Sequence, residues 1–203
     1  MKSSSWELDP QKFLSRKDAD RLQAVTREKT ESGDPVAIRD CFVIRLGLAT
    51  GLRVMEIAAL ECGDLSLEDT LPSLIVASGK GKKRRRVFFN DAFKRQCKEY
   101  LAWKQTLGES TESDRPLLLS SSTGGHLTTR AIQKAFKRCA QRAGLSSHYS
   151  IHCLRHTYAC FLLKAGNWNL RLVQKQLGHS KITTTQVYAD VMMPEIKKAL
   201  DRL

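Results

Sequence analysis

The sequence predicts a mainly α-helical protein with one small antiparallel β-sheet, an α+β fold. Two observations lead to this prediction: apolar residues recur at helical spacing between clear start and stop signals, and one pair of short β-rich segments flanks a glycine-containing turn. The chain has 203 residues, of which 41% are hydrophobic and only five are prolines. This length and composition are typical of one folded domain with a real core and exclude a disordered or low-complexity chain.

The first helices are predicted from their caps. Ser15 precedes an acidic residue at the third helical position, which is typical of an N-cap. Asp34, followed by proline, begins a second helix whose apolar residues recur at helical spacing until Gly51 interrupts them. A third, short helix follows and carries Arg53. Residues 1–14 form a polar tail before these elements, and residues 15–203 form the domain.

A hairpin with a cationic tip is predicted next. The segments Leu74–Ala77 and Arg86–Phe89 read as strands, and Ser78–Lys82 reads as the turn between them. Six of the seven residues from Lys80 to Arg86 are basic. A basic run taken alone is usually a solvated loop, but at the tip of a hairpin it suits insertion beside phosphates.

More helices are predicted after the hairpin, separated by a polar linker over residues 109–125. Glycines are expected to end the first at Gly108 and the last of this group at Gly178. A final amphipathic helix is predicted over Pro194–Leu203. The predicted caps of the others are Asn90 or Asp91, Thr128, Ser150 and, approximately, Asn167.

The six cysteines are expected to be small buried thiols, because they contain no C-x-x-C pair and mostly fall at apolar helical positions. His148, His152 and His156 recur every fourth residue near Cys153, which would suit zinc if one helix carried all three histidines. With Ser150 as N-cap, His148 would precede that helix. We therefore expect no metal site.

The charge balance indicates a polyanionic partner. The chain carries 34 Lys and Arg against 21 Asp and Glu, a formal net charge of +13. Its apolar stretches are far shorter than the ~20 residues that a membrane span needs, and the amino terminus has no apolar secretory segment. We expect a cytoplasmic protein without membrane contact.

Separate segments supply groups that suit a phosphodiester. Two guanidiniums can bind the nonbridging oxygens through charge-assisted hydrogen bonds, and the start of a helix favours an anion. A tyrosine with a pKa near ~10 is a nucleophile only if cations and a proton acceptor assist it. A lysine whose pKa is lowered by neighbouring cations could protonate the leaving alkoxide. These groups are Arg53, Lys80, His152 with Arg155, and His179 with Tyr188.

The order and spacing of these motifs resemble the tyrosine recombinase (phage integrase) family. The chain reads TGLRVMEIAAL over residues 50–60, SGKGKKRR over 78–85, HCLRH over 152–156 and LGHSKITTTQVY over 177–188. The resemblance runs from about Leu14 to the end. It implies the catalytic-domain fold of that family.

The resemblance also implies a mechanism. The family's catalytic positions carry over to Arg53, Lys80, His152, Arg155, His179 and Tyr188. Tyr188 would attack a phosphate of duplex DNA to form a 3′-phosphotyrosyl link and a free 5′-hydroxyl. The two arginines would stabilise the transition state, Lys80 would protonate the leaving oxygen, His152 would assist proton transfer and His179 would bond the phosphate. Such enzymes need neither metal nor ATP, so no cofactor is expected.

Other residues receive supporting roles. Glu56 is expected to orient the turn at Arg53, and His156 to be a packed structural histidine. Lys82 is the rival to Lys80 as the acid, and Ile151 stands where relatives usually have proline. The expected DNA-binding residues are Lys82, Lys83, Arg84 and Arg130.

Most relatives carry an amino-terminal clamp domain, and we expect none here. The layout is similar to the short recombinases that invert fimbrial promoters, or to the catalytic portion of a longer integrase. Two alternatives stay open: a DNA-binding regulator or fragment without recombination of its own, and DNA relaxation like that of a type IB topoisomerase. The expected partners are double-stranded DNA, three further copies in a homo-tetramer held by the C-terminal helix, and accessory DNA-bending proteins, all in the cytoplasm at the nucleoid.

Overall fold

The structure is a computed structural model that describes residues 12–30, 33–77, 84–179, 185, 186 and 188. The predicted hairpin turn with Lys80, Lys82 and Lys83 lies outside these residues, and so does the predicted helix Pro194–Leu203. Within them the fold is mostly helical with one small antiparallel sheet, as the sequence predicts.

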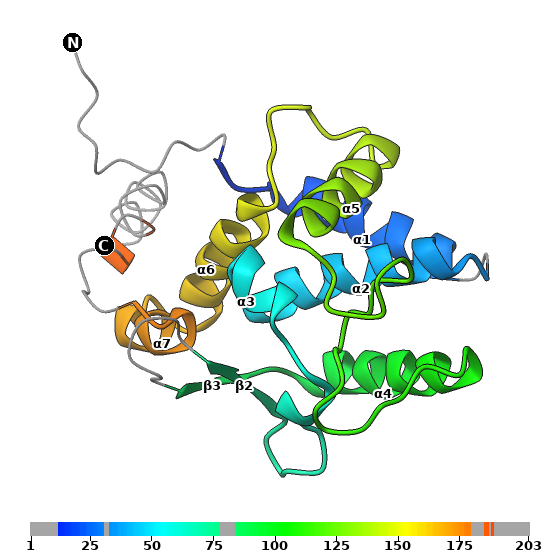
Figure 1. The fold of residues 1–203 in the computed structure, drawn as a ribbon. Coiled ribbons are helices and arrows are strands. Elements are labelled where there is room, and N and C mark those ends of the chain that lie inside the picture. The colour runs from blue at the N-terminus through cyan, green and yellow to red at the C-terminus, as the bar shows by residue number, and fades with distance from the viewer. Residues whose placement is uncertain (1–11, 31–32, 78–83, 180–184, 187, 189–203) are drawn as a thin grey trace, which may run out of the picture.

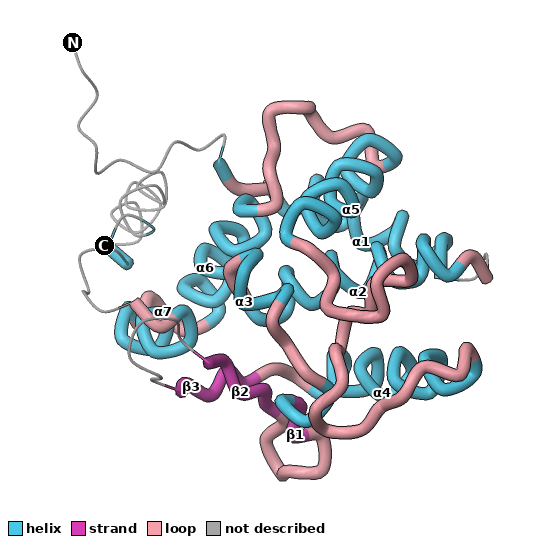
Figure 2. The backbone as a smooth tube through the Cα atoms, viewed as in Figure 1, coloured by secondary structure: helices cyan, strands magenta, loops and turns pink. Residues whose placement is uncertain are grey.

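The central helix, α2, contacts most of the other helices (Figure 1). It packs against α1, α3, α4, α5 and α6, and α6 in turn packs against α7. The sheet lies beneath α3, with α7 at one end and α4 towards the other (Figure 2). The helices are α1 (Arg16–Thr30), α2 (Pro35–Thr50), α3 (Val54–Ala58), α4 (Asp91–Thr106), α5 (Thr129–Arg142), α6 (His152–Ala165) and α7 (Leu170–Leu177).

Both predicted ends of α2 are confirmed. The Asp34 side chain accepts a hydrogen bond from the Val36 N–H at 3.0 Å, and Gly51 ends the helix in the left-handed conformation with φ 63°. A β-carbon at Gly51 would also lie 2.4 Å from the Tyr158 ring and 2.9 Å from Leu177. Glycine is therefore required here both by the backbone conformation and by the close approach of α6 and α7.

The sheet contains the predicted hairpin and one further strand. β2 (Ser73–Ala77) pairs with β3 (Arg84–Phe88) in antiparallel register, with Leu74 opposite Val87. β3 begins two residues earlier than predicted, and β1 (Leu65–Ser66) was not predicted, because a two-residue strand is too short to show an alternating pattern.

Most predicted helix starts are confirmed, and two are wrong. The Asn90 and Thr128 side chains cap α4 and α5 as predicted, whereas Ser150 caps nothing by its side chain. Ile151 has helical backbone angles, so α6 begins without a side-chain acceptor. α7 begins at Leu170 with Asn169 as its cap, because the residues before it adopt positive φ values that no helix continues through.

The core consists of two apolar clusters. The larger surrounds α2 and includes Ile132, Phe136, Cys139 and Ala140 of α5, and the smaller joins the end of α6, α7 and the Tyr188 ring. The chain is already packed at Leu14, whose side chain is buried and whose N–H bonds to Thr157. All six cysteines are buried free thiols, as predicted. No described helix is long and apolar enough to cross a bilayer.

Candidate active site

Arg53 stands between α2 and α3 and is held by Glu56. Its backbone is extended, and its N–H donates to one Glu56 oxygen at 2.8 Å while its Nη1 donates to the other at 3.0 Å. The Arg53 side chain is 47% exposed. One edge of the guanidinium is therefore fixed by the protein, and the remaining N–H groups face solvent.

Arg155, one turn into α6, is almost wholly buried beside it. Its Nη1 donates to the carbonyl oxygen of Gly51 at 2.7 Å, and its Nη2 donates to that of Leu177 at 2.9 Å. The same Nη1 lies 4.0 Å from Glu56. Burial, reinforced by the nearby Arg53 charge, lowers the pKa of Arg155 to about 10, so it remains a cation at pH 7. Arg155 thus joins the ends of α2 and α7.

Tyr188 and His179 complete the cluster. The Tyr188 hydroxyl lies 3.1 Å from Nδ1 of His156, and the Tyr188 and His179 rings are nearly parallel with centroids 6.4 Å apart. Nδ1 of His179 is 3.0 Å from the Thr185 hydroxyl oxygen. The phenol is only 3% exposed and packs on α6 and α7.

Burial sets the protonation of these rings. It raises the pKa of Tyr188 to about 12, although the charges of Arg155 and Arg53 act in the opposite direction. Burial, together with the neighbouring arginines, lowers the pKa of His179 to about 4, and burial lowers that of His156 to about 4. Both histidines are therefore neutral at pH 7, and each ring has one nitrogen that can accept a hydrogen bond.

His152 is exposed at the first residue of α6. It lines a hollow of about 380 Å³ together with Lys12, His148 and His156. Among the described residues, no group of three or more His, Cys, Asp or Glu side chains is arranged to hold a metal ion.

Arg85 belongs to the site, and the sequence analysis missed it. Its two terminal nitrogens donate to the two oxygens of Glu56 at 2.8 and 2.9 Å. The predicted strand began only at Arg86, so Arg85 was given no orientation. Strand alternation carries the signal: Arg84 and Arg86 are exposed, whereas Arg85 between them is mostly buried. His156 was expected to be structural only, yet it contacts the Tyr188 hydroxyl.

Some of the predicted catalytic residues therefore lie close together, and others do not. Arg53, Arg155, His179 and Tyr188 form one cluster, and His152 lies at its edge. Lys80 lies outside the described residues, as do Lys82 and Lys83. The other two predicted DNA-binding residues, Arg84 and Arg130, are exposed.

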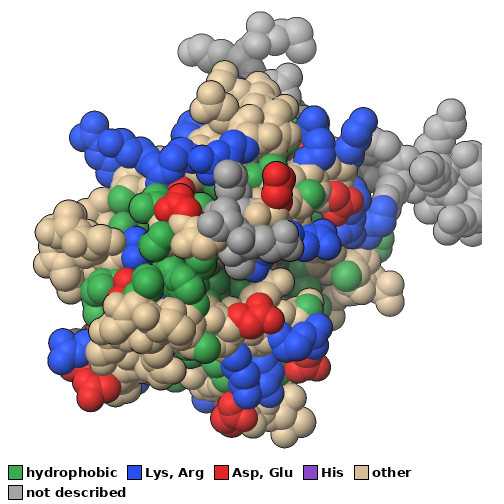
Figure 3. Space-filling model, turned by 90° about the vertical axis from the view of Figure 1, so that its right-hand side faces the viewer, with side chains coloured by type: hydrophobic (Ala, Val, Ile, Leu, Met, Phe, Trp, Pro, Cys, Tyr) green, Lys and Arg blue, Asp and Glu red, His purple; other side chains and the backbone are tan. Residues whose placement is uncertain are grey.

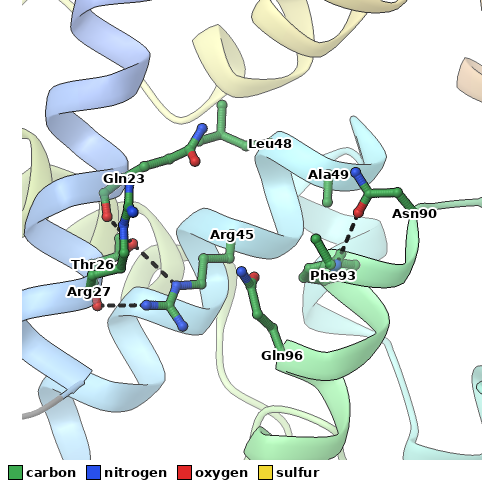
Figure 4. A pocket seen from close by; sticks show the side chains of 10 residues that line it. Gln23, Thr26, Arg27, Arg45, Leu48, Ala49, Asn90, Phe93 and Gln96 are labelled. Carbon is green, nitrogen blue, oxygen red and sulfur yellow. Dashed lines mark hydrogen bonds between the residues drawn. The ribbon is translucent and has the colours of Figure 1, made fainter.

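A second hollow, of about 330 Å³, lies between α1, α2 and the start of α4 (Figure 4). Arg45 points into it and donates to the side chain and carbonyl of Thr26 at 3.2 and 2.9 Å. No candidate catalytic residue lines it. The side of the molecule turned away from α7 carries basic and acidic side chains interspersed over its upper and lower parts, as a solvated surface does (Figure 3).

Comparison with known proteins connects this cluster to one family. The model of the phage integrase family matches residues 12–195. The chain is 36% identical over 171 residues to tyrosine recombinase XerC of Neisseria meningitidis serogroup C, covering 84% of this chain and 53% of that protein. It is 35% identical over 164 residues to XerC of Lactobacillus leichmannii, covering 81% and 54%.

Solved structures give the same result. The XerH site-specific recombinase bound to its difH substrate superposes with a TM-score of 0.74 at 27% identity, over 93% of this chain and 52% of that chain. A lambda integrase dimer bound to a core site has the same fold at a TM-score of 0.64 and 20% identity, over 92% and 49%. The chain thus spans about half the length of these proteins.

Proposed function

The chain belongs to the phage integrase family, and we propose that residues 15–203 are a catalytic domain that cleaves and rejoins duplex DNA for site-specific recombination. The single observation that carries the proposal is the convergence of Arg53, Arg155, His179 and Tyr188, which come from four separate segments of the chain. Two guanidiniums, a neutral imidazole and a phenol are the groups that phosphoryl transfer to tyrosine requires.

In the proposed step, the Tyr188 oxygen attacks the phosphorus and the bond from phosphorus to the 5′-oxygen breaks. The phenol proton leaves to a neutral histidine, for which His152 is proposed and His156 lies at 3.1 Å in the free protein. The 5′-oxygen takes a proton from Lys80. Attack by an incoming 5′-hydroxyl reverses the step, so the phosphodiester is restored without ATP.

Tyr188 is neither ionised nor accessible in the free protein, so DNA binding must change its surroundings before it can attack. With a pKa of about 12, forming the phenolate at pH 7 costs about 7 kcal/mol. A phenol that is 3% exposed also cannot touch a phosphate on the surface. Attack therefore requires the Tyr188 hydroxyl to become accessible when DNA binds.

The proposal is tested by trapping the covalent intermediate. The protein is incubated with nicked suicide substrates tiled across the DNA that flanks its own gene, and adducts are resolved on denaturing gels. We expect an adduct that is absent in Tyr188→Phe and has phosphotyrosine at Tyr188. An adduct that survives Tyr188→Phe, or none across the tiled DNA, would contradict the proposal.

Two other functions predict different results when the protein is incubated with DNA. A DNA-binding regulator would give salt-dependent binding without an adduct. A topoisomerase-like enzyme would relax supercoiled plasmid that lacks the flanking DNA. The same proposal includes contacts to the duplex from Arg130, Arg84, Lys82 and Lys83. It also includes assembly into a tetramer through Pro194–Leu203 and the help of accessory DNA-bending proteins. The reaction is proposed to take place in the cytoplasm, at the nucleoid.

A further inference from the structure

Arg85 lies where three parts of the site meet. Its guanidinium forms a two-pronged bond with Glu56 on α3, and its Nε donates to the Gln176 carbonyl of α7 at 3.4 Å. Three residues further along β3, the Phe88 N–H donates to the Gln176 side-chain oxygen at 3.1 Å. Hydrogen bonds of Arg85 and Phe88 therefore connect β3 to α3 and α7.

Gly178 shows how closely α7 approaches Arg85. A β-carbon at Gly178 would lie 2.6 Å from Cδ of Arg85, and the glycine has a left-handed φ of 66°. The preceding residue, Leu177, supplies the carbonyl that accepts from Arg155. The position of Arg85 thus bears directly on the backbone that holds Arg155.

The charges around Glu56 give Arg85 a second role. The carboxylate accepts from Arg53 and Arg85 and lies 4.0 Å from Arg155. Burial alone would raise the pKa of Glu56, but the bonds from Arg85 and from the Arg53 N–H hold it at about 2, so the carboxylate is ionised. If Arg85 were absent, the negative charge of the nearly buried Glu56 would, among the described residues, be neutralised only by Arg53 and Arg155. These are the two cations that the phosphate needs.

We propose that Arg85 is a positioning residue for DNA cleavage: it neutralises Glu56 and fastens β3 to α3 and α7, so that Arg53 and Arg155 keep their charge and geometry for the scissile phosphate. Arg85 touches no DNA in this role. The proposal rests on the proposed function, because it assigns Arg85 a part in that reaction.

The first test uses the free protein. Carbon-13 NMR follows the Glu56 carboxyl through an acid titration in wild type, Arg85→Gln and the matched control Arg86→Gln. Arg86 carries the same charge on the same strand but pairs with Asp69 at the surface. We expect the pKa of Glu56 to rise clearly in Arg85→Gln and not in Arg86→Gln. Equal values in all three proteins would overturn the proposal, whatever DNA chemistry the protein performs.

The second test measures the rate of adduct formation at saturating DNA. We expect Arg85→Gln to lower this rate about 100-fold, as a small misplacement of catalytic groups does, with DNA affinity changed no more than in Arg86→Gln. Arg85→Lys should recover only part of the rate, because lysine lacks the fork that matches both carboxylate oxygens. A wild-type rate in Arg85→Gln would overturn the proposal.

A substrate with a neutral methylphosphonate at the scissile position tests whether Arg85→Gln acts through Arg53 and Arg155 or through a general disturbance of the fold. Removing the phosphate charge lessens the need for Arg53 and Arg155, so the rate difference between wild type and Arg85→Gln should shrink, as it should for Arg53→Ala. An unchanged difference on this substrate would overturn the proposal. Absence of any wild-type adduct would instead contradict the proposed function, while the Glu56 titration would still decide whether Arg85 neutralises Glu56.

Discussion

Tyr188 and its two histidine neighbours, His156 and His179, are uncharged at pH 7. The phenol is buried beside Arg155, and the rings of His156 and His179 stay neutral because burial and nearby arginines disfavour their protonated forms. A ring nitrogen of His156 thus lies 3.1 Å from the buried hydroxyl of Tyr188. Arg53, Arg155, His179 and Tyr188 lie close together in the free protein, but the phenol is shielded from solvent.

These histidines predict acid sensitivity. Their folded pKa of about 4 lies below the ~6.5 of an unfolded histidine, so the unfolded chain binds more protons between these values and stability falls as pH drops from about 6.5 to 4. We expect a loss of about 2 kcal/mol, less than two full shifts would give, because both rings keep some contact with water. Glu56, with its lowered pKa, continues the loss below about pH 4.5.

Urea unfolding at pH 7.5, 6 and 4.5 measures this dependence. His156→Gln, which removes one of the two titrating rings, should flatten the slope between pH 6.5 and 4. A free energy of unfolding that is constant between pH 7.5 and 4.5 would show that the histidines do not titrate as inferred.

The basic residues of α5 differ in their surroundings. Arg138 donates two hydrogen bonds to the buried Asp40, at 2.6 and 2.8 Å, and Lys137 donates to the carbonyls of Ser147 and Tyr149. Arg130, at the start of the helix, is exposed. The basic residues of α5 are therefore of two kinds: some bond within the protein and others are exposed.

A matched pair of substitutions on α5 separates these kinds. Arg130→Ala should weaken DNA binding and reduce the slope of log K against log salt by about one, with stability unchanged. Arg138→Ala should destabilise the fold by about 3 kcal/mol, because it leaves the Asp40 carboxylate buried without its partner. Salt-dependent fluorescence anisotropy and urea unfolding measure the two effects. The reverse pattern would show that Arg138, not Arg130, faces the duplex.

The whole molecule is organised by the crossing of α2 and α6. Gly47 of α2 faces Leu154 of α6 so closely that a β-carbon at position 47 would lie 2.7 Å from a Leu154 methyl group. The residue after Leu154 is Arg155, which bonds to Gly51 at the end of α2. The close contact of two core helices therefore places a catalytic candidate.

Gly47→Ala tests this link between core and site. We expect a loss of about 1 to 3 kcal/mol, because Leu154 is buried and cannot move aside freely. The rate of adduct formation should fall as well. Adding Leu154→Ala should recover part of the loss through coupling between the two positions. Gly125→Ala is the control, since the nearest atom to its β-carbon is 3.7 Å away. Equal stability of Gly47→Ala and Gly125→Ala would contradict the inference.

The local elements could be read from the sequence because their causes are local. The caps Asp34, Asn90 and Thr128, and the left-handed Gly51 and Gly178, act within one turn of the helices that they start or end. The pairing of β2 with β3 follows from two short β-rich segments that lie close together in the chain. The starts of α6 and α7 were misjudged, because Ile151 and Asn169, not the expected residues, occupy the N-cap positions of these helices.

The sequence by itself thus determined the elements, the buried cysteines and the order of the motifs that indicate a tyrosine recombinase. Only the tertiary structure decided the partners of the side chains. Arg85 meets Glu56 across 29 positions of the chain, and His156 meets Tyr188 across 32. Such pairs depend on how the helices pack around α2, because helical and strand periodicity determines which side of an element a residue lies on but not which residue it faces.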